Sequence, residues 1–155
     1  MANRITRDLK EICILSVLVV VATLFIFTNS IMDYESSHGI SGNVADIIID
    51  TEESKEVWEL FIRKSAHMIE YAVLGVAMIT LVKQVEKDFG KKYYSMTLFY
   101  VLSVAVIDEH IQSFSDRTSS TSDILLDFTG AVIGILAALG AMWIVKRIRR
   151  IKKGE

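Results

Sequence analysis

Runs of apolar residues that can cross a membrane are the feature that most constrains this chain. The spans cover residues 12–27, about 63–82, about 93–112 and 122–145, and their apolar blocks lack the alternation of an amphipathic helix or strand. A helix of about 20 apolar residues spans the hydrocarbon layer. The chain has 155 residues, 52% of them hydrophobic, and no proline that would break a helix. We therefore expect an all-α, polytopic membrane protein with four transmembrane helices, in a single domain over residues 1–155.

The first apolar run has the basic start that a signal peptide also shows. Arg4, Arg7 and Lys10 precede it, but no small-residue cleavage site follows, and further spans do. We interpret the run as an uncleaved first transmembrane helix.

The segment 28–62 is polar and acidic, and we expect short amphipathic or re-entrant helices in the outer loop 30–62. Within it, residues 43–49 are apolar but too short to span. A helical pattern begins at Ser54, and Trp58 suits a membrane–water boundary.

The charges predict the orientation. Most of the 17 Lys and Arg residues lie in the first 11 residues, in the loop 83–92 and in the tail 146–155. Most of the 19 acidic residues and all three histidines lie in the other two loops or the adjoining helix ends. Because basic loops stay in the cytoplasm, both termini are expected there, with 146–155 as a basic cytoplasmic tail.

Several ionisable residues fall where hydrocarbon is expected. Counting back about 20 residues from Val82 starts the second span near Arg63, so Lys64, His67 and Glu70 lie within its outer part. Residues three and four apart share a helix face, so Tyr71 joins the face of Lys64 and His67.

The next two spans repeat this arrangement. The same count carries the third span to about Gln112, which places Asp108 and Glu109 at the membrane boundary. On the fourth span, Asp123 and Asp127 share a face with a G-x-x-x-G step at residues 130–134, which favours close helix packing. We therefore expect the charged groups of three spans to converge.

The composition of this cluster suggests its chemistry. Carboxylates exceed cations, so some of them must bind a proton, a cation or a metal, or lie beside Lys or Arg. His67 titrates near neutral pH and is the natural acid–base residue. A structural alternative stays open, in which the charges are interfacial or form ion pairs, although Glu70 and Asp127 lie at least one turn inside their spans.

Several common chemistries have no signature in the chain. It contains no H-E-x-x-H, no G-x-S-x-G and no phosphate-binding loop. The single cysteine, Cys13, forms no internal disulfide. His67 and Glu70 have a spacing that could supply two metal ligands, but no cysteine or second deep histidine supports zinc.

Two polar blocks carry a recognisable pattern. The first reads Arg63-Lys64-x-x-His67-x-x-x-Tyr71-x-x-Leu74-Gly75. The second reads Asp108-Glu109-x-x-Gln112-x-Phe114-x-x-x-Arg117, then Asp123-x-x-x-Asp127-x-x-Gly130-x-x-x-Gly134. Over residues 60–140 the chain resembles the VanZ-like family, small bacterial integral membrane proteins named for one associated with resistance to the glycopeptide teicoplanin. Where the family pattern leads us to expect Asn, this chain has Asp127.

The resemblance implies a multi-pass protein of the bacterial cytoplasmic membrane that lowers susceptibility to lipid-bearing glycopeptides through an extracytoplasmic polar site. The partners expected are membrane lipids and a lipid-linked or cell-wall ligand or the glycopeptide, and no nucleic acid. The candidate catalytic residues are His67, Asp108 and Glu109. The candidate binding residues are Lys64, Glu70, Tyr71, Gln112, Arg117, Asp123 and Asp127.

Two routes fit these residues. In an enzyme, Lys64 and Arg117 hold an anionic group and His67 transfers protons with Asp108 or Glu109, while Asp123 and Asp127 orient these groups or bind a divalent cation. The sequence itself requires no cofactor, and a divalent cation is the one it could accommodate. In a non-enzymatic protein, the cluster is a recognition pocket or a structural ion-pair network. An ion-coupled transporter is less favoured, because the inner halves of the spans have no polar residue stronger than Ser or Thr.

Overall fold

A computed structural model of the chain describes residues 2–36, 52–90, 92–113 and 120–154. The regular structure in these ranges is entirely helical. The helices are α1 (Ala2–Ser36), α3 (Glu52–Phe89), α4 (Tyr94–Ser113) and α5 (Thr121–Lys153). The prediction of an all-α fold is confirmed.

The helices are longer than the apolar runs on which the predictions rest. Residues 30–36 continue α1, and residues 52–62 are the first turns of α3 rather than a separate short helix. No proline interrupts either stretch, so each long helix continues through its polar residues. The predicted short segment 43–49 lies outside the described residues.

Three of the four helices are long and apolar enough to cross a membrane. The qualifying stretches are Asp8–Ile31, Leu60–Phe89 and Thr121–Lys153. Helix α4 has 20 residues, which corresponds to about 30 Å, and its last turns contain Asp108, Glu109 and His110, which lower its hydropathy. The fourth crossing therefore stays a prediction.

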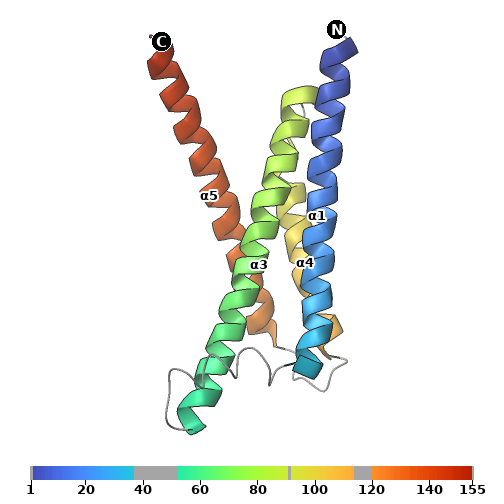
Figure 1. Ribbon diagram of the computed structural model, residues 1–155, viewed down its shortest axis with the longest axis vertical. Helices are drawn as coiled ribbons and strands as arrows, with labels where there is room; N and C mark the ends of the chain where they lie inside the picture. Colours follow the sequence, from blue (N-terminus) through green and yellow to red (C-terminus); the bar gives the residue numbers. More distant parts are fainter. Residues whose placement is uncertain (1, 37–51, 91, 114–119, 155) are drawn as a thin grey trace.

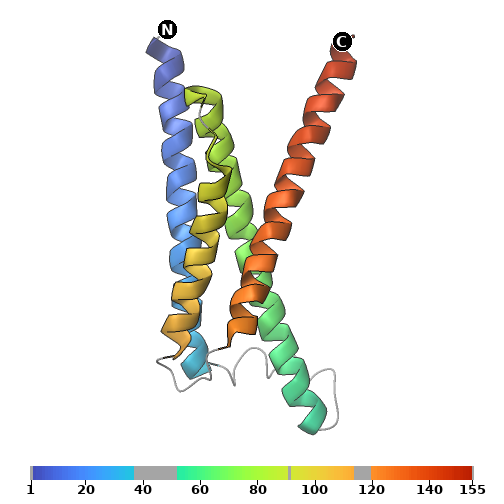
Figure 2. The same cartoon turned by 180° about the vertical axis from the view of Figure 1, so that it is seen from behind.

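The helices form an asymmetric bundle in which the two termini lie at the same end (Figure 1). Helix α3 contacts α1, α4 and α5, and its contact with α5 is the most extensive. Helices α1 and α4 lie side by side, as both views show (Figure 2). Toward its C-terminus α5 diverges from the other helices, so the bundle is tightest at the end far from the termini.

The core lies where the four helices meet. Every helix contributes to it, with Ile26 from α1, Tyr71 and Leu74 from α3, Val101 from α4 and Ala131 from α5. Many large apolar side chains outside this core are exposed, including Phe99 and Leu136. An apolar exterior of this kind is expected for helices that face lipid.

Small residues bring α3 and α5 into close contact. A Cβ atom on Gly134 would overlap the backbone carbonyl of Ala72, and one on Gly130 would overlap the backbone and side chain of Met68. In the same way, a Cβ on Gly75 would overlap the backbone of Ala131. The glycines of the G-x-x-x-G step therefore face α3, and they hold the acidic end of α5 against the helix that carries Lys64 and His67.

At the opposite end, a polar cluster joins α3 to α4. Lys83 donates a hydrogen bond to Glu86 over 2.9 Å and also contacts the hydroxyl of Tyr94, which itself donates to Glu86. Nearby, Gln84 donates to Glu11 of α1 over 2.9 Å. These contacts fix the short connection between α3 and α4.

Candidate functional site

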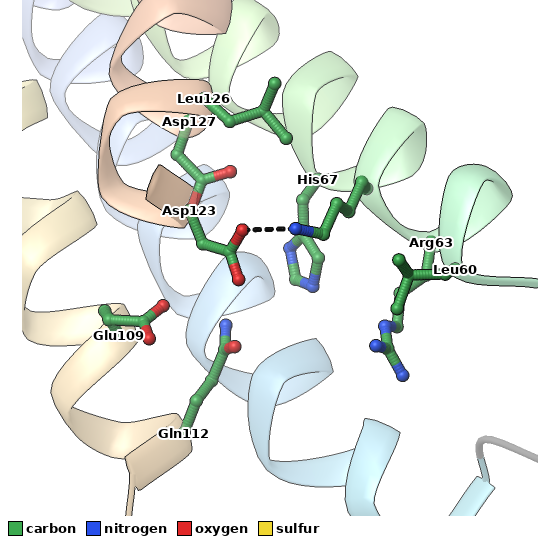
Figure 3. Close-up of a pocket in the computed structure, with 9 residues that line it drawn as sticks. Leu60, Arg63, His67, Glu109, Gln112, Asp123, Leu126 and Asp127 are labelled. Atoms are coloured by element: carbon green, nitrogen blue, oxygen red, sulfur yellow. Dashed lines mark hydrogen bonds and ion pairs between the residues drawn. The ribbon is translucent and has the colours of Figure 1, made fainter. Parts of the chain in front are cut away.

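A polar cavity lies at the tight end of the bundle, between α3, α4 and α5. Its volume is about 270 Å³. Figure 3 shows charged and amide side chains from these helices around it, with Glu109 and Gln112 from α4 and Asp123 and Asp127 from α5. We call it the site cavity. Its lining consists of Leu60, Arg63, Lys64, His67, Glu109, Gln112, Asp123, Leu126 and Asp127.

An ion pair connects the two sides of the site cavity. Nζ of Lys64 on α3 lies 2.5 Å from Oδ1 of Asp123 on α5, the contact drawn as a dashed line in Figure 3. Both side chains are about one-third exposed. The pair therefore lies at the mouth of the cavity, while Asp127, one turn further along α5, is buried.

Glu109 joins the end of α4 to the start of α5. Its Oε1 accepts a hydrogen bond of 2.6 Å from the backbone N–H of Ser120, the N-cap residue of α5. A carboxylate is favourable beside a helix N-terminus because of the unsatisfied N–H groups there. Its other oxygen, Oε2, is buried and has no hydrogen-bond partner among the described residues. Glu109 thus has a structural contact in addition to its place in the cavity wall.

Gln112 links the cavity to the buried carboxyl of Asp108. Its Nε2 donates to Oδ2 of Asp108 over 3.1 Å and to the hydroxyl of Ser30 on α1 over 3.2 Å. Asp108 is fully buried and lies behind Gln112 rather than in the cavity wall. Its Oδ1 accepts no hydrogen bond with favourable geometry from the described residues.

His67 stands at the centre of the acidic cluster. Its Nδ1 lies 3.7 Å from Oε2 of Glu70, and it is close enough to interact electrostatically with Asp108 and Asp127. Glu70 in turn accepts a hydrogen bond of 2.7 Å at Oε1 from the side chain of Asn29 on α1. An imidazole can donate a hydrogen bond to a ligand or exchange a proton with one.

Tyr71 lies beneath the cavity. It is fully buried, and its hydroxyl is close to the carboxyl of Asp108. It does not contribute to the cavity wall.

The structure brings most of the predicted site residues together. Six of them line the site cavity, namely Lys64, His67, Glu109, Gln112, Asp123 and Asp127. Glu70, Tyr71 and Asp108 lie behind that wall and contact its members or one another. Arg117 lies outside the described residues. Arg63, which also lines the cavity, precedes Lys64 in the motif.

Two residues of α1 were missed by the sequence-based prediction. Asn29 holds Glu70, and Ser30, which is buried, holds Gln112. The available signal was the polar triplet Thr28-Asn29-Ser30 at the end of the first apolar run. Because that run was treated as an anchor, its polar end was assigned to a loop.

The acidic residues do not form an evident metal site. Among the described residues, no group of three His, Cys, Asp or Glu side chains is arranged to hold a metal ion. The carboxylates instead contact Lys64, Ser120, Gln112 and Asn29.

Together these features define a class of protein: a small helical membrane protein with a polar cavity enclosed at one end of its bundle. Such a cavity within membrane helices is maintained only where its charged groups face one another, water or a ligand.

The family follows from comparison with known proteins. The family model described as VanZ/LLP1 matches residues 13–145, most of the chain, and the protein belongs to that family. The matched region includes residues 13–36 of α1, with Asn29 and Ser30, as well as the motif blocks of α3, α4 and α5. No curated protein and no solved structure matches the chain.

Proposed function

We propose that the site cavity binds a lipid-linked or surface component of the bacterial cell envelope on the extracytoplasmic side. The effect of this binding is lowered susceptibility to lipid-bearing glycopeptides such as teicoplanin. The observation that carries the proposal is the convergence of Lys64, His67, Gln112 and Asp123 from three helices on one cavity of about 270 Å³. Family membership supplies the envelope setting.

The proposal includes a topology of four crossings with both termini in the cytoplasm. It is supported by the position of both termini at one end of the bundle (Figure 1). The site cavity is lined by the last turn of α4 and the first turns of α5, which lie away from that end. The segment 146–153, which is rich in Lys and Arg, and the last turns of α3 lie toward the end of the bundle that carries the termini, as expected for cytoplasmic segments.

The chemistry of the cavity suits a ligand that carries both charge and hydrogen-bonding groups. Arg63 and Lys64 supply cationic donors at the mouth, and Asp127 and Glu109 supply acceptors deeper inside. A phosphate or carboxylate of the ligand would contact the cations, and hydroxyl or amine groups would contact the carboxylates. The ammonium of Lys64 would then exchange part of its contact with Asp123 for the ligand.

Two forms of the proposal differ in the role of His67. In an enzyme, His67 transfers a proton to or from the bound molecule and Glu70 orients its ring. In a binding protein, His67 only donates a hydrogen bond. The contacts of Glu109 and Asp108 favour the binding protein. Each carboxylate already accepts a hydrogen bond within the protein, Glu109 from Ser120 and Asp108 from Gln112.

The test is a set of neutral substitutions scored for both abundance and phenotype. His67→Gln, Gln112→Leu and Asp123→Asn are expressed in a susceptible bacterial host, and their membrane levels and teicoplanin susceptibility are measured. We expect each variant to reach normal abundance and to lose protection. A glycopeptide without a lipid chain serves as the comparison antibiotic.

Asp88→Asn is the matched control, because it neutralises an aspartate at the opposite end of α3. It should leave both measurements unchanged. Abundant variants that protect as well as the parent would refute the proposal. Variants that disappear from the membrane would instead assign the cluster a structural role.

A further inference from the structure

A second cavity lies on the side of the bundle, in the groove between α1 and α3. Its volume is about 680 Å³, and its walls are almost entirely apolar. Val21 and Phe25 of α1 face Val73 and Val76 of α3 across it. Glu70 is the one ionisable residue among the described residues of its wall, and we call this cavity the α1–α3 groove.

The groove has the dimensions of a hydrocarbon chain. On α3 its lining runs from Ile69 to Thr80, and on α1 from Leu15 to Ile26. At a rise of 1.5 Å per residue, each stretch is about 16 Å long. This is close to half the thickness of the hydrocarbon layer, which is about 30 Å, and therefore to the depth that one lipid chain fills.

The groove begins where the site cavity ends. Glu70 forms the polar end of the groove, and its Oε2 lies 3.7 Å from Nδ1 of His67, which lines the site cavity. Asn29 holds the other oxygen of Glu70 from α1. One layer of side chains, Glu70 and His67, thus separates the apolar groove from the polar cavity.

We infer that the α1–α3 groove binds one hydrocarbon chain of a membrane lipid, whose polar part lies at the Asn29–Glu70 pair beside His67. This inference rests on the proposed function and deepens it: the ligand of the site is a lipid rather than a soluble or wall-bound molecule. The apolar groove and the polar cavity lie side by side, so a molecule with a hydrocarbon chain and a polar part would place each part against a surface of matching polarity.

The experiment uses the full chain in vesicles of phosphatidylglycerol that contain a trace of the same lipid with a diazirine on one acyl chain. After irradiation, the labelled peptides are identified by mass spectrometry. We expect residues 69–80 to be labelled several-fold more than equally exposed apolar faces of α4 and α5. Val73→Trp, which fills the groove, should remove this excess.

Val106→Trp on α4 is the matched control, because Val106 is 48% exposed against 56% for Val73 and does not line the groove. It should leave the labelling of 69–80 unchanged. Equal labelling of all exposed apolar faces would mean that the groove only contacts bulk lipid, and it would overturn the inference. Protection of 69–80 in a dimer would assign the groove to a second copy of the chain and also overturn it.

The outcome is separable from that of the proposed function, because labelling requires no antibiotic. If cavity variants lose protection while 69–80 are labelled no more than other faces, the lipid inference alone fails. If 69–80 are labelled but cavity variants protect fully, the proposed function alone fails.

Discussion

Lys64 and Asp123 are separated by 59 residues in the chain and by 2.5 Å in the structure. Their ion pair lies at the mouth of the site cavity and joins α3 to α5. It is partly exposed, and ion pairs in contact with water contribute little to stability because solvent screens them.

The coupling between these two residues can be measured with a double-mutant cycle. We expect Lys64→Met and Asp123→Asn to show a coupling free energy of about 0.2–1 kcal/mol in thermal unfolding followed in detergent. Strictly additive effects would mean that the pair does not persist in the folded protein.

The close helix contact at the G-x-x-x-G step predicts a larger effect on stability than the ion pair does. Gly134→Ala places a methyl group on the carbonyl of Ala72, and we expect a loss of about 1–3 kcal/mol in the free energy of unfolding. Titration of the folded protein with a denaturing detergent would measure this loss.

Gly140 provides the control for that substitution, because it lies on the same helix and a Cβ atom there would meet no atom of another element within 4 Å among the described residues. Gly140→Ala should stabilise the protein by up to about 1 kcal/mol through helix propensity. Equal effects at the two glycines would contradict the close contact.

The polar residues of α1 give a third prediction. Ser30→Ala removes the acceptor that Gln112 uses and should cost about 1 kcal/mol. Thr28→Val, two residues away, removes an exposed hydroxyl that bonds its own helix at Leu24 and should change stability by less than about 0.5 kcal/mol. Thermal melting of the two variants in parallel tests the difference.

Asp127 offers a fourth prediction. The family pattern leads us to expect Asn there, and the residue is buried close to Asp108 and Asp123. Asp127→Asn should retain protection and keep or raise stability by about 1 kcal/mol, because one buried carboxylate is neutralised. Loss of protection at normal abundance would instead give this carboxylate a role of its own.

The proposed orientation is tested with cysteine labelling. In a Cys13→Ser background, Ser122→Cys should react with a membrane-impermeant maleimide in intact cells, and Lys152→Cys should react only after lysis. The reverse pattern would place the site cavity in the cytoplasm.

The sequence predicted the convergence of α3 and α5 well, because two periodic signals agreed. Asp123 and Asp127 share a face with Gly130 and Gly134, and that face contacts the helix of Lys64. The all-helical fold followed from the apolar runs, and α4 begins and ends within one residue of the predicted span of 93–112.

The contacts that α1 makes with the site residues could not be derived from the sequence in this way. Asn29 and Ser30 follow an apolar run, and their partners Glu70 and Gln112 lie 41 and 82 residues away. Helical periodicity relates residues only three or four apart, so it gives no register between α1 and its neighbours. The end of α1 was placed too early, and the polar turns before Arg63 were expected in the outer loop rather than as part of α3. The reason is related, because polar turns continue a helix when nothing breaks it.

The glycine contacts between α3 and α5 carry a consequence for how this family can vary. In lipid, two helices are held together by the fit of their surfaces rather than by exclusion of water. The spacing between the carboxylates of α5 and the cations of α3 is therefore set by the thickness of a few small residues located more deeply in the membrane. Exchange among glycine, alanine and serine at positions 72, 75, 130 and 134 would change the width of the polar cavity in steps of one atom, without altering any residue that faces it.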